Sequence, residues 1–268
     1  MIRNKLKNIS LLILLSIHFL NLVAQNKSTQ ECWGHIFEKQ QVNGTFVLHN
    51  PSSGDTKFYN KERSDSTFLP ASTFKILNSL IALETNAVSD IDEIIKWDDI
   101  NRGWDEWNKD QSMKTAMPVS CVWFYQELAR RIGEEKMQMY LDKVGYGNSE
   151  MGGRIDNFWL EGDLRISANE QIRIIEKLIL NYLPFDKTHQ ETVKKLMLSD
   201  SSNKYKLYSK TGWAARVKKQ IGWFVGFVES NNETWIFALN MDINSDSDAR
   251  YRKQITYEIL EKEGIIEL

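Results

Sequence analysis

The chain has 268 residues, enough for one large domain or two closely packed ones. It is 42% hydrophobic and 26% charged, and its 34 basic and 36 acidic side chains give a formal net charge of −2, which excludes a strongly basic nucleic-acid-binding protein. Two cysteines and four histidines are too few for a disulfide framework or a cysteine–histidine zinc cluster, so we expect no metal site.

Residues 1–24 have the layout of a secretory signal peptide. Three basic side chains within the first seven residues precede a mostly apolar stretch over residues 9–24, which ends in the small residue Ala24. An uncleaved anchor is the alternative, but polar residues interrupt this stretch and it is shorter than the roughly 20 apolar residues that a span needs. We therefore expect cleavage, export to the periplasm or the medium, and no stable span in the mature chain.

Segments with β-strand character lie near both ends of the mature chain. Residues 45–49 and 57–59, separated by a turn cluster, predict a β-hairpin. Three more strands are expected over residues 205–209, 221–228 and 234–239.

The remaining sequence has apolar side chains at helical spacing. It predicts helices from about Ser72, from Ser120, beyond Gly133, over residues 167–182, over residues 188–198, and from Tyr251 to the end of the chain. The helix over residues 167–182 opens with a capping box formed by Ser167 and Glu170.

Strands at both ends with helices between them predict an α/β fold of the α+β type. We expect an antiparallel sheet built from both termini and flanked by helices, with an all-helical domain inserted. The sheet-containing domain is placed in residues 25–70 and 200–268, and the helical domain in residues 71–199.

A candidate nucleophile stands at the start of the first helix, in the segment P-A-S-T-F-K. Ser72 and Lys75 are three residues apart on one helix face, so the lysine can act as the base that a serine nucleophile needs. S-x-x-K is frequent by chance, and a helix-capping Ser72 with a solvated Lys75 is the alternative. Two features weaken that alternative. Lys75 occupies the position at which a capping box has glutamate, and a cation in the first helical turn opposes the helix dipole.

Two further motifs follow in order. Ser120-Cys121-Val122 opens the next helix, and Lys210-Thr211-Gly212 ends the strand predicted from Tyr205. S-x-x-K, S-D-N and K-T-G form the signature of serine β-lactamases and penicillin-binding proteins, and here S-x-V stands in place of S-D-N.

From about Trp33 to its C-terminus the chain resembles a class D (oxacillinase-type) serine β-lactamase. Tyr146-Gly147-Asn148 matches the Y-G-N element of that family, and F-W-L at 158–160 with L-R-I-S at 164–167 matches its W-L…L-x-I-S stretch. S-x-V separates the chain from class A. The resemblance implies an enzyme that opens penicillin-type β-lactams and confers antibiotic resistance.

The resemblance also implies a mechanism. Ser72 is expected to attack the lactam carbonyl and form an acyl-enzyme. Lys75 is expected to react with CO2 to give N6-carboxylysine, the general base for acylation and deacylation, with no other cofactor. Trp159 is expected to donate its indole N–H to that carbamate, and Val122 to cover it with an apolar side chain. Ser120 is expected to relay a proton to the leaving nitrogen.

The strand with K-T-G, which we expect at an edge of the sheet, and the last helix are expected to bind the substrate. Lys210 would keep the local potential positive, Thr211 and Gly212 would line the substrate, and the backbone N–H of Trp213 would join that of Ser72 in an oxyanion hole. The carboxylate of a β-lactam needs a cation, for which Arg252 is the candidate. Arg250 is the alternative, and a solvated arginine is the plainer interpretation of either.

Other questions stay open from the sequence. Cys32 and Cys121 could pair in an oxidising compartment, although a buried free thiol is the expected state of Cys121. The substrate spectrum depends on the loops around Trp104 and after Thr211, and the chain could be a monomer or a homodimer. A non-hydrolytic penicillin sensor and a D,D-peptidase are the alternative functions, which steady hydrolysis of nitrocefin distinguishes.

Overall fold

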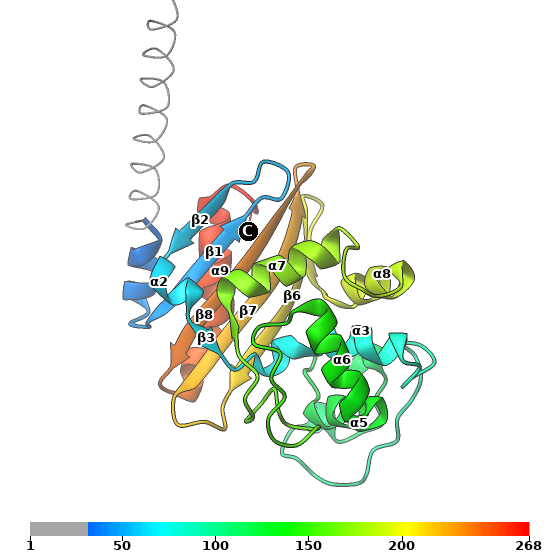
Figure 1. Cartoon of the computed structure of the whole chain (residues 1–268). Helices are drawn as coiled ribbons and strands as arrows, with labels where there is room; N and C mark the ends of the chain where they lie inside the picture. Colours follow the sequence, from blue (N-terminus) through cyan, green and yellow to red (C-terminus); the bar gives the residue numbers. More distant parts are fainter. Residues whose placement is uncertain (1–31, 268) are drawn as a thin grey trace, which may run out of the picture.

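The computed structural model describes residues 32–267, and the predicted signal peptide lies outside these described residues (Figure 1). Within them, no helix combines the length and the apolar character that crossing a membrane requires. Cys32 and Cys121 are free thiols, and Cys121 is buried as expected.

A six-stranded antiparallel sheet is assembled from both ends of the described chain, in the order β2-β1-β8-β7-β6-β5. Its strands are β1 (Gly44–His49), β2 (Thr56–Tyr59), β5 (Leu198–Ser201), β6 (Tyr205–Ala214), β7 (Gln220–Ser230) and β8 (Glu233–Ile243). The N-terminal hairpin joins the C-terminal strands where Phe46 of β1 lies opposite Leu239 of β8. This sheet, with helices around it, confirms the predicted fold class.

All of the predicted helices are present, with ends shifted by a few residues. The helices and 3-10 turns are α2 (Lys61–Asp65), η1 (Ala71–Phe74), α3 (Lys75–Glu84), η2 (Asp105–Trp107), α4 (Met113–Ala116), α5 (Val122–Ile132), α6 (Glu134–Val144), α7 (Ala168–Ile179), α8 (Lys187–Leu196), η3 (Asp246–Arg250) and α9 (Tyr251–Lys262). Residues 32–39 are also helical. The short strands β3 (Thr67–Phe68) and β4 (Ile166–Ser167) pair with each other, and the capping box of Ser167 and Glu170 opens α7 as predicted.

Two details of the predicted strands were wrong. K-T-G does not end its strand, because β6 continues to Ala214. Nor is β6 the edge strand, since β5 pairs with it. The β5 sequence L-S-D-S lacks the β-branched and aromatic side chains that mark a strand, and so it escaped prediction. Because the pairing of β5 with β6 ends at Tyr208, no strand among residues 32–267 covers that side of β6 where it carries K-T-G.

Each face of the sheet packs against its own hydrophobic core. Along β7, Trp223, Val225 and Phe227 belong to the core under α7 and the helical region, whereas Phe224 and Val228 belong to the core under α9. This alternation follows from the two-residue repeat of a strand, and burial of both faces explains the nearly unbroken apolar sequence of β7.

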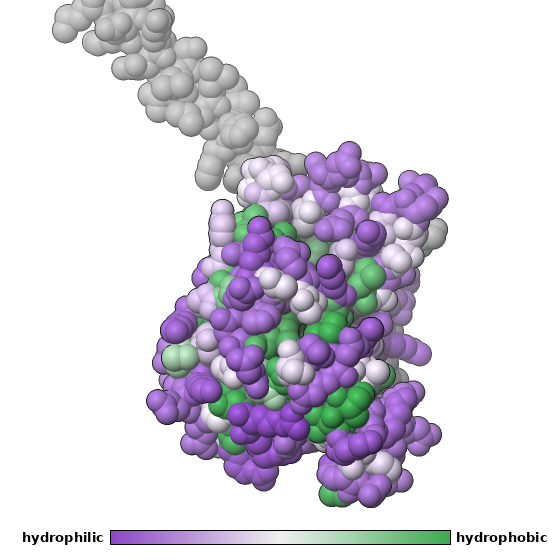
Figure 2. All heavy atoms as spheres, turned by 90° about the vertical axis from the view of Figure 1, so that its right-hand side faces the viewer, coloured by the Kyte–Doolittle hydropathy of each residue, from purple (hydrophilic) through white to green (hydrophobic). Residues whose placement is uncertain are grey.

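Helix α7 lies across the face of the sheet opposite α9, while α3, α5 and α6 form a group beside it (Figure 1). The division into a sheet domain and a helical domain at residues 71 and 199 stays a prediction. It assigns α7 to the helical domain, although α7 contacts β1, β7 and β8 of the sheet. Figure 2 shows the side at the right of Figure 1, which is mostly hydrophilic with small hydrophobic areas, so the apolar side chains there are mostly turned inward.

Candidate active site

The S-x-x-K motif lies at the junction between the 3-10 turn η1 and helix α3. Ser72 is in η1 and is 9% exposed, and Lys75 is the first residue of α3. The turn brings Lys75 Nζ to 2.8 Å from Ser72 Oγ. The residue before the serine, Ala71, has a left-handed backbone (φ 49°), and its N–H donates to the carbonyl of Trp159 at 3.0 Å. A strained, well-anchored backbone therefore presents the serine.

Lys75 is fully buried, and its Nζ lies 5.3 Å from the centre of the Tyr125 ring. Burial lowers the pKa of Lys75 to about 7, because an ammonium loses its hydration there. A large part of this side chain is therefore an unprotonated amine at neutral pH. The interpretation of Lys75 as a solvated surface charge is wrong.

Ser120 and Lys210 meet although 90 residues separate them in sequence. Ser120 has a left-handed backbone (φ 57°) two residues before α5 begins, and Lys210 Nζ donates to its hydroxyl at 2.6 Å. Lys210 is 3% exposed. Burial and then the positive charge of Lys75 lower the pKa of Lys210 well below its ordinary value.

Glycine at position 212 suits the close approach of β6 to η1. A Cβ at this position would lie 3.0 Å from the carbonyl oxygen of Pro70 and 3.1 Å from Cγ2 of Thr73. Glycine therefore lets K-T-G run against the turn that carries the nucleophile. Its neighbours Thr211 and Trp213 line the same cavity as Ser72.

Trp159 is fully buried and stacks on Phe74, with ring centres 5.4 Å apart. Its indole Nε1 has no hydrogen-bond partner in the described residues, which is costly for a buried N–H group. Val122, the first residue of α5, is partly buried and lines the cavity. A hydrogen-bond acceptor attached to a neighbouring side chain would give the indole N–H of Trp159 a partner.

A cavity of about 740 Å³ opens beside Ser72 and Ser120. Trp104 and Trp107, whose rings stack 5.8 Å apart, form part of its wall, and Trp104 is 56% exposed. The aromatic loop around Trp104 thus does border the site.

Arg252 lines this cavity and Arg250 does not. The Arg252 guanidinium donates to the carbonyl oxygens of Gly212 (2.7 Å) and Ala249 (2.6 Å). Burial lowers the pKa of Arg252 to about 10, which leaves it charged at neutral pH. Arg250 is exposed and lies over the ring of Tyr251.

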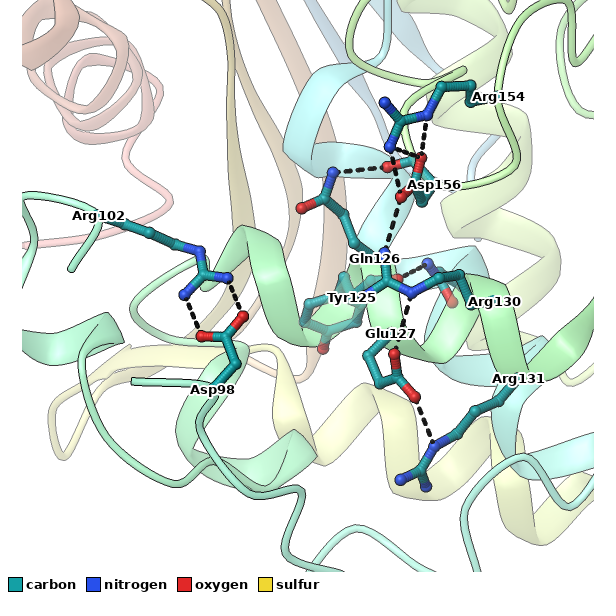
Figure 3. Close-up of polar contacts among 10 residues, drawn as sticks. Asp98, Arg102, Tyr125, Gln126, Glu127, Arg130, Arg131, Arg154 and Asp156 are labelled. Carbon is teal, nitrogen blue, oxygen red and sulfur yellow. Dashed lines mark hydrogen bonds and ion pairs between the residues drawn. The ribbon is translucent and has the colours of Figure 1, made fainter. Parts of the chain in front are cut away.

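Two more arginines of the cavity were missed by the sequence analysis. Arg216, in the turn after β6, donates to Glu161 at 2.8 Å and so joins that turn to the loop of Trp159. Arg102 is held by both carboxylate oxygens of Asp98 (Figure 3). Its guanidinium lies over the Trp123 ring. Neither is part of a motif, and loops whose course depends on tertiary packing bring both to the cavity.

Comparison with known proteins agrees with this geometry. The family described as the penicillin binding protein transpeptidase domain matches residues 22–261. β-Lactamase OXA-5 of Pseudomonas aeruginosa is 39% identical over 264 residues, which cover 97% of this chain and 99% of that protein. The chain belongs to the class D β-lactamases.

Two other relatives support this assignment. β-Lactamase OXA-48 of Klebsiella pneumoniae is 41% identical over 251 residues, which cover 94% of this chain and 95% of that protein. The crystal structure of the class D β-lactamase YbXI from Nostoc has a TM-score of 0.86 at 40% identity and covers 87% of this chain and 99% of that one. The chain is thus a β-lactam hydrolase of a class whose members are serine enzymes without a metal. Within residues 32–267, no group of three or more His, Cys, Asp or Glu side chains could hold a metal ion.

Proposed function

We propose that this class D β-lactamase opens penicillin-type antibiotics through an acyl-enzyme on Ser72, with N-carboxylated Lys75 as the general base. The observation that carries the proposal is the buried 2.8 Å contact between Lys75 Nζ and Ser72 Oγ. The Trp159 ring, which stacks on Phe74 next to Lys75 in the chain, has a buried indole N–H that lacks an acceptor within the described residues. A serine hydroxyl is a weak nucleophile until a neighbouring base accepts its proton.

The cavity supplies the other groups that acylation needs. Ser72 Oγ gives its proton to the base at Lys75 and bonds to the lactam carbonyl carbon, after which the ring C–N bond breaks. The leaving nitrogen takes its proton from the Ser120 hydroxyl, which takes one in turn from Lys210 Nζ, its hydrogen-bond donor at 2.6 Å. We assign the oxyanion hole to the backbone N–H groups of Ser72 and Trp213.

The surroundings of Lys75 fit a carbamate formed with CO2. That reaction needs an unprotonated amine, which the lowered pKa of Lys75 supplies. The N-terminus of α3 favours an anion at this position, Trp159 Nε1 can donate to it, and Val122 shields it from water. The carbamate supplies a general base first for Ser72 and then for the water that hydrolyses the acyl ester.

The charge of Lys210 depends on the state of Lys75. The positive charge of an unmodified Lys75 contributes to the low pKa of Lys210, after burial. A negative charge on Lys75 replaces this repulsion by attraction and so favours protonated Lys210. Lys210 then provides positive potential beside Ser120 and Thr211, where the substrate binds.

Replacing Arg252 by alanine should impair catalysis far more than replacing Arg250. Loss of a charge-assisted hydrogen bond to the substrate carboxylate should cost about 1.5–3 kcal/mol of transition-state stabilisation, seen as a lower kcat/KM for a penicillin. Arg250→Ala is the matched control, because Arg250 is exposed and outside the cavity lining. A larger loss in Arg250→Ala than in Arg252→Ala contradicts the assignment.

We further propose that the protein is exported after removal of residues 1–24 and confers β-lactam resistance. The layout of those residues supports export. Expression in a susceptible bacterium should raise the minimum inhibitory concentration of a penicillin, and the mass of the recovered protein should correspond to a chain without its leader.

Steady-state kinetics test the proposed hydrolysis directly. Mature protein should turn over nitrocefin many times per active site. A single stoichiometric burst would identify a penicillin sensor instead, and cleavage of a peptide ending in D-Ala-D-Ala without nitrocefin turnover would identify a D,D-peptidase.

A further inference from the structure

The position of Trp159 depends on a segment without regular secondary structure between α6 and β4. Residues 154–162 are folded into consecutive turns, in which the amides of Phe158 and Leu160 donate to the carbonyl oxygens of Arg154 and Asn157. The carbonyl of Trp159 accepts the N–H of Ala71, next to Ser72. A shift of this segment would therefore move both the indole ring and the backbone before the nucleophile.

Asp156 attaches this segment to helix α5. It is 6% exposed, and its carboxylate accepts hydrogen bonds from Arg130 (2.7 Å) and from two nitrogens of Arg154 (2.9 and 3.1 Å) (Figure 3). Its backbone carbonyl accepts a further hydrogen bond from Gln126 at 2.9 Å. Because Gln126 and Arg130 are four residues apart, they lie on one face of α5. From there Gln126 holds the backbone of Asp156 and Arg130 holds its carboxylate.

The helix that Asp156 grips also carries other parts of the site. Val122 is the first residue of α5, Ser120 precedes it, and the Tyr125 ring faces Lys75. The carbonyl of Tyr125 accepts a hydrogen bond from Asn78 of α3 at 3.1 Å, which links α5 to the helix of Lys75. Asp156 therefore connects the Trp159 segment to the frame that holds the remaining groups.

The contacts at Asp156 suit a permanent ionic clamp. Burial alone would raise the pKa of Asp156, but the hydrogen bonds from Arg154 and Arg130 outweigh it and lower the pKa below its ordinary value. The carboxylate is thus ionised at neutral pH and satisfied by partners on both the loop and the helix.

We propose that Asp156 is a positioning residue for Lys75 carboxylation: by holding residues 154–162 against α5, it keeps the Trp159 indole beside Lys75 and so sets how much CO2 the enzyme needs. This inference rests on the proposed carbamate at Lys75. Supporting groups of this kind determine whether a reactive side chain is held tightly enough to work.

Bicarbonate titration in CO2-depleted buffer tests the proposal. Asp156→Asn should need about tenfold more bicarbonate for half-maximal nitrocefin hydrolysis, with much of the rate restored at saturation. Glu127→Gln is the matched control, because Glu127 pairs with Arg130 in the same cluster but makes no hydrogen bond or ion pair with residues 154–162. Glu127→Gln should need the same bicarbonate concentration for half-maximal hydrolysis as the wild type.

Hydrogen exchange provides a readout independent of activity. The amides of Ala71 and of residues 157–162 should exchange faster in Asp156→Asn than in the wild type or Glu127→Gln. If Asp156→Asn does not fold, Arg154→Gln replaces it, since the Arg154 side chain is 73% exposed and the contacts of Arg130 and Gln126 remain. Arg154→Gln should then show a smaller increase in the bicarbonate requirement and in the rate of amide exchange.

The possible outcomes separate this inference from the proposed function. If the wild type responds to bicarbonate but the folded variant needs no more bicarbonate than the wild type, only the proposed role of Asp156 is overturned. Unchanged amide hydrogen exchange in the variant has the same consequence. A wild type that does not respond to bicarbonate overturns the carbamate itself, and with it a role of Asp156 in carboxylation.

Discussion

Ser72→Ala should abolish acylation by β-lactams. Its Oγ is the hydroxyl in contact with Lys75 Nζ, whereas the hydroxyl of Ser120 contacts Lys210. Ser120 therefore does not share the base, and kcat/KM should fall by about 10⁴-fold or more. Intact-protein mass spectrometry with a penicillin should detect no covalent adduct in this variant.

Ser120→Ala is the informative control for that experiment. It removes the proposed proton relay but keeps Ser72 and Lys75, so it should still form the adduct, more slowly. A persistent adduct in Ser72→Ala would show that another side chain is the nucleophile.

Lys75→Ala should trap the acyl-enzyme. Without a base, slow acylation can persist because the oxyanion hole still stabilises the attack, but nothing activates the hydrolytic water. Deacylation should nearly stop, and a penicillin adduct should accumulate by mass spectrometry while steady turnover is lost. Loss of acylation with unimpaired deacylation would assign Lys75 to the first step only.

The same assignment predicts a dependence on pH and CO2. Only the unprotonated amine reacts with CO2, and the pKa of Lys75 is about 7. Protonation therefore competes with carboxylation as the pH falls through about 7, so activity in CO2-depleted buffer should decline on the acid side and recover when bicarbonate is added. Initial rates with and without bicarbonate from pH 5.5 to 8 measure this.

Variants of the neighbouring groups make the test specific. Trp159→Phe removes the N–H donor but keeps a ring to pack on Phe74, so it should need more bicarbonate than the wild type. Ser120→Ala should be slower with an unchanged bicarbonate requirement. Equal rates with and without bicarbonate at every pH would mean that Lys75 acts as a free amine.

Much of the fold was predictable because its signals are local. The hairpin of β1 and β2, the capping box before α7 and the helix after S-x-V each depend on residues a few positions apart, and each is present. The short strand β5 was not predictable in this way, because its polar sequence forms a strand only through pairing with β6.

The sequence by itself determined which residue types compose the site, since the spacing of Ser72 and Lys75 places both on one turn and two further motifs follow in order. Only the tertiary structure decided their chemistry. Burial, which no local pattern encodes, lowers the pKa of Lys75, and the packing of β6 against η1 brings Lys210 to Ser120 across 90 residues. The docking of α9 likewise directs Arg252 to Gly212, whereas Arg250, the last residue of η3, is exposed to solvent.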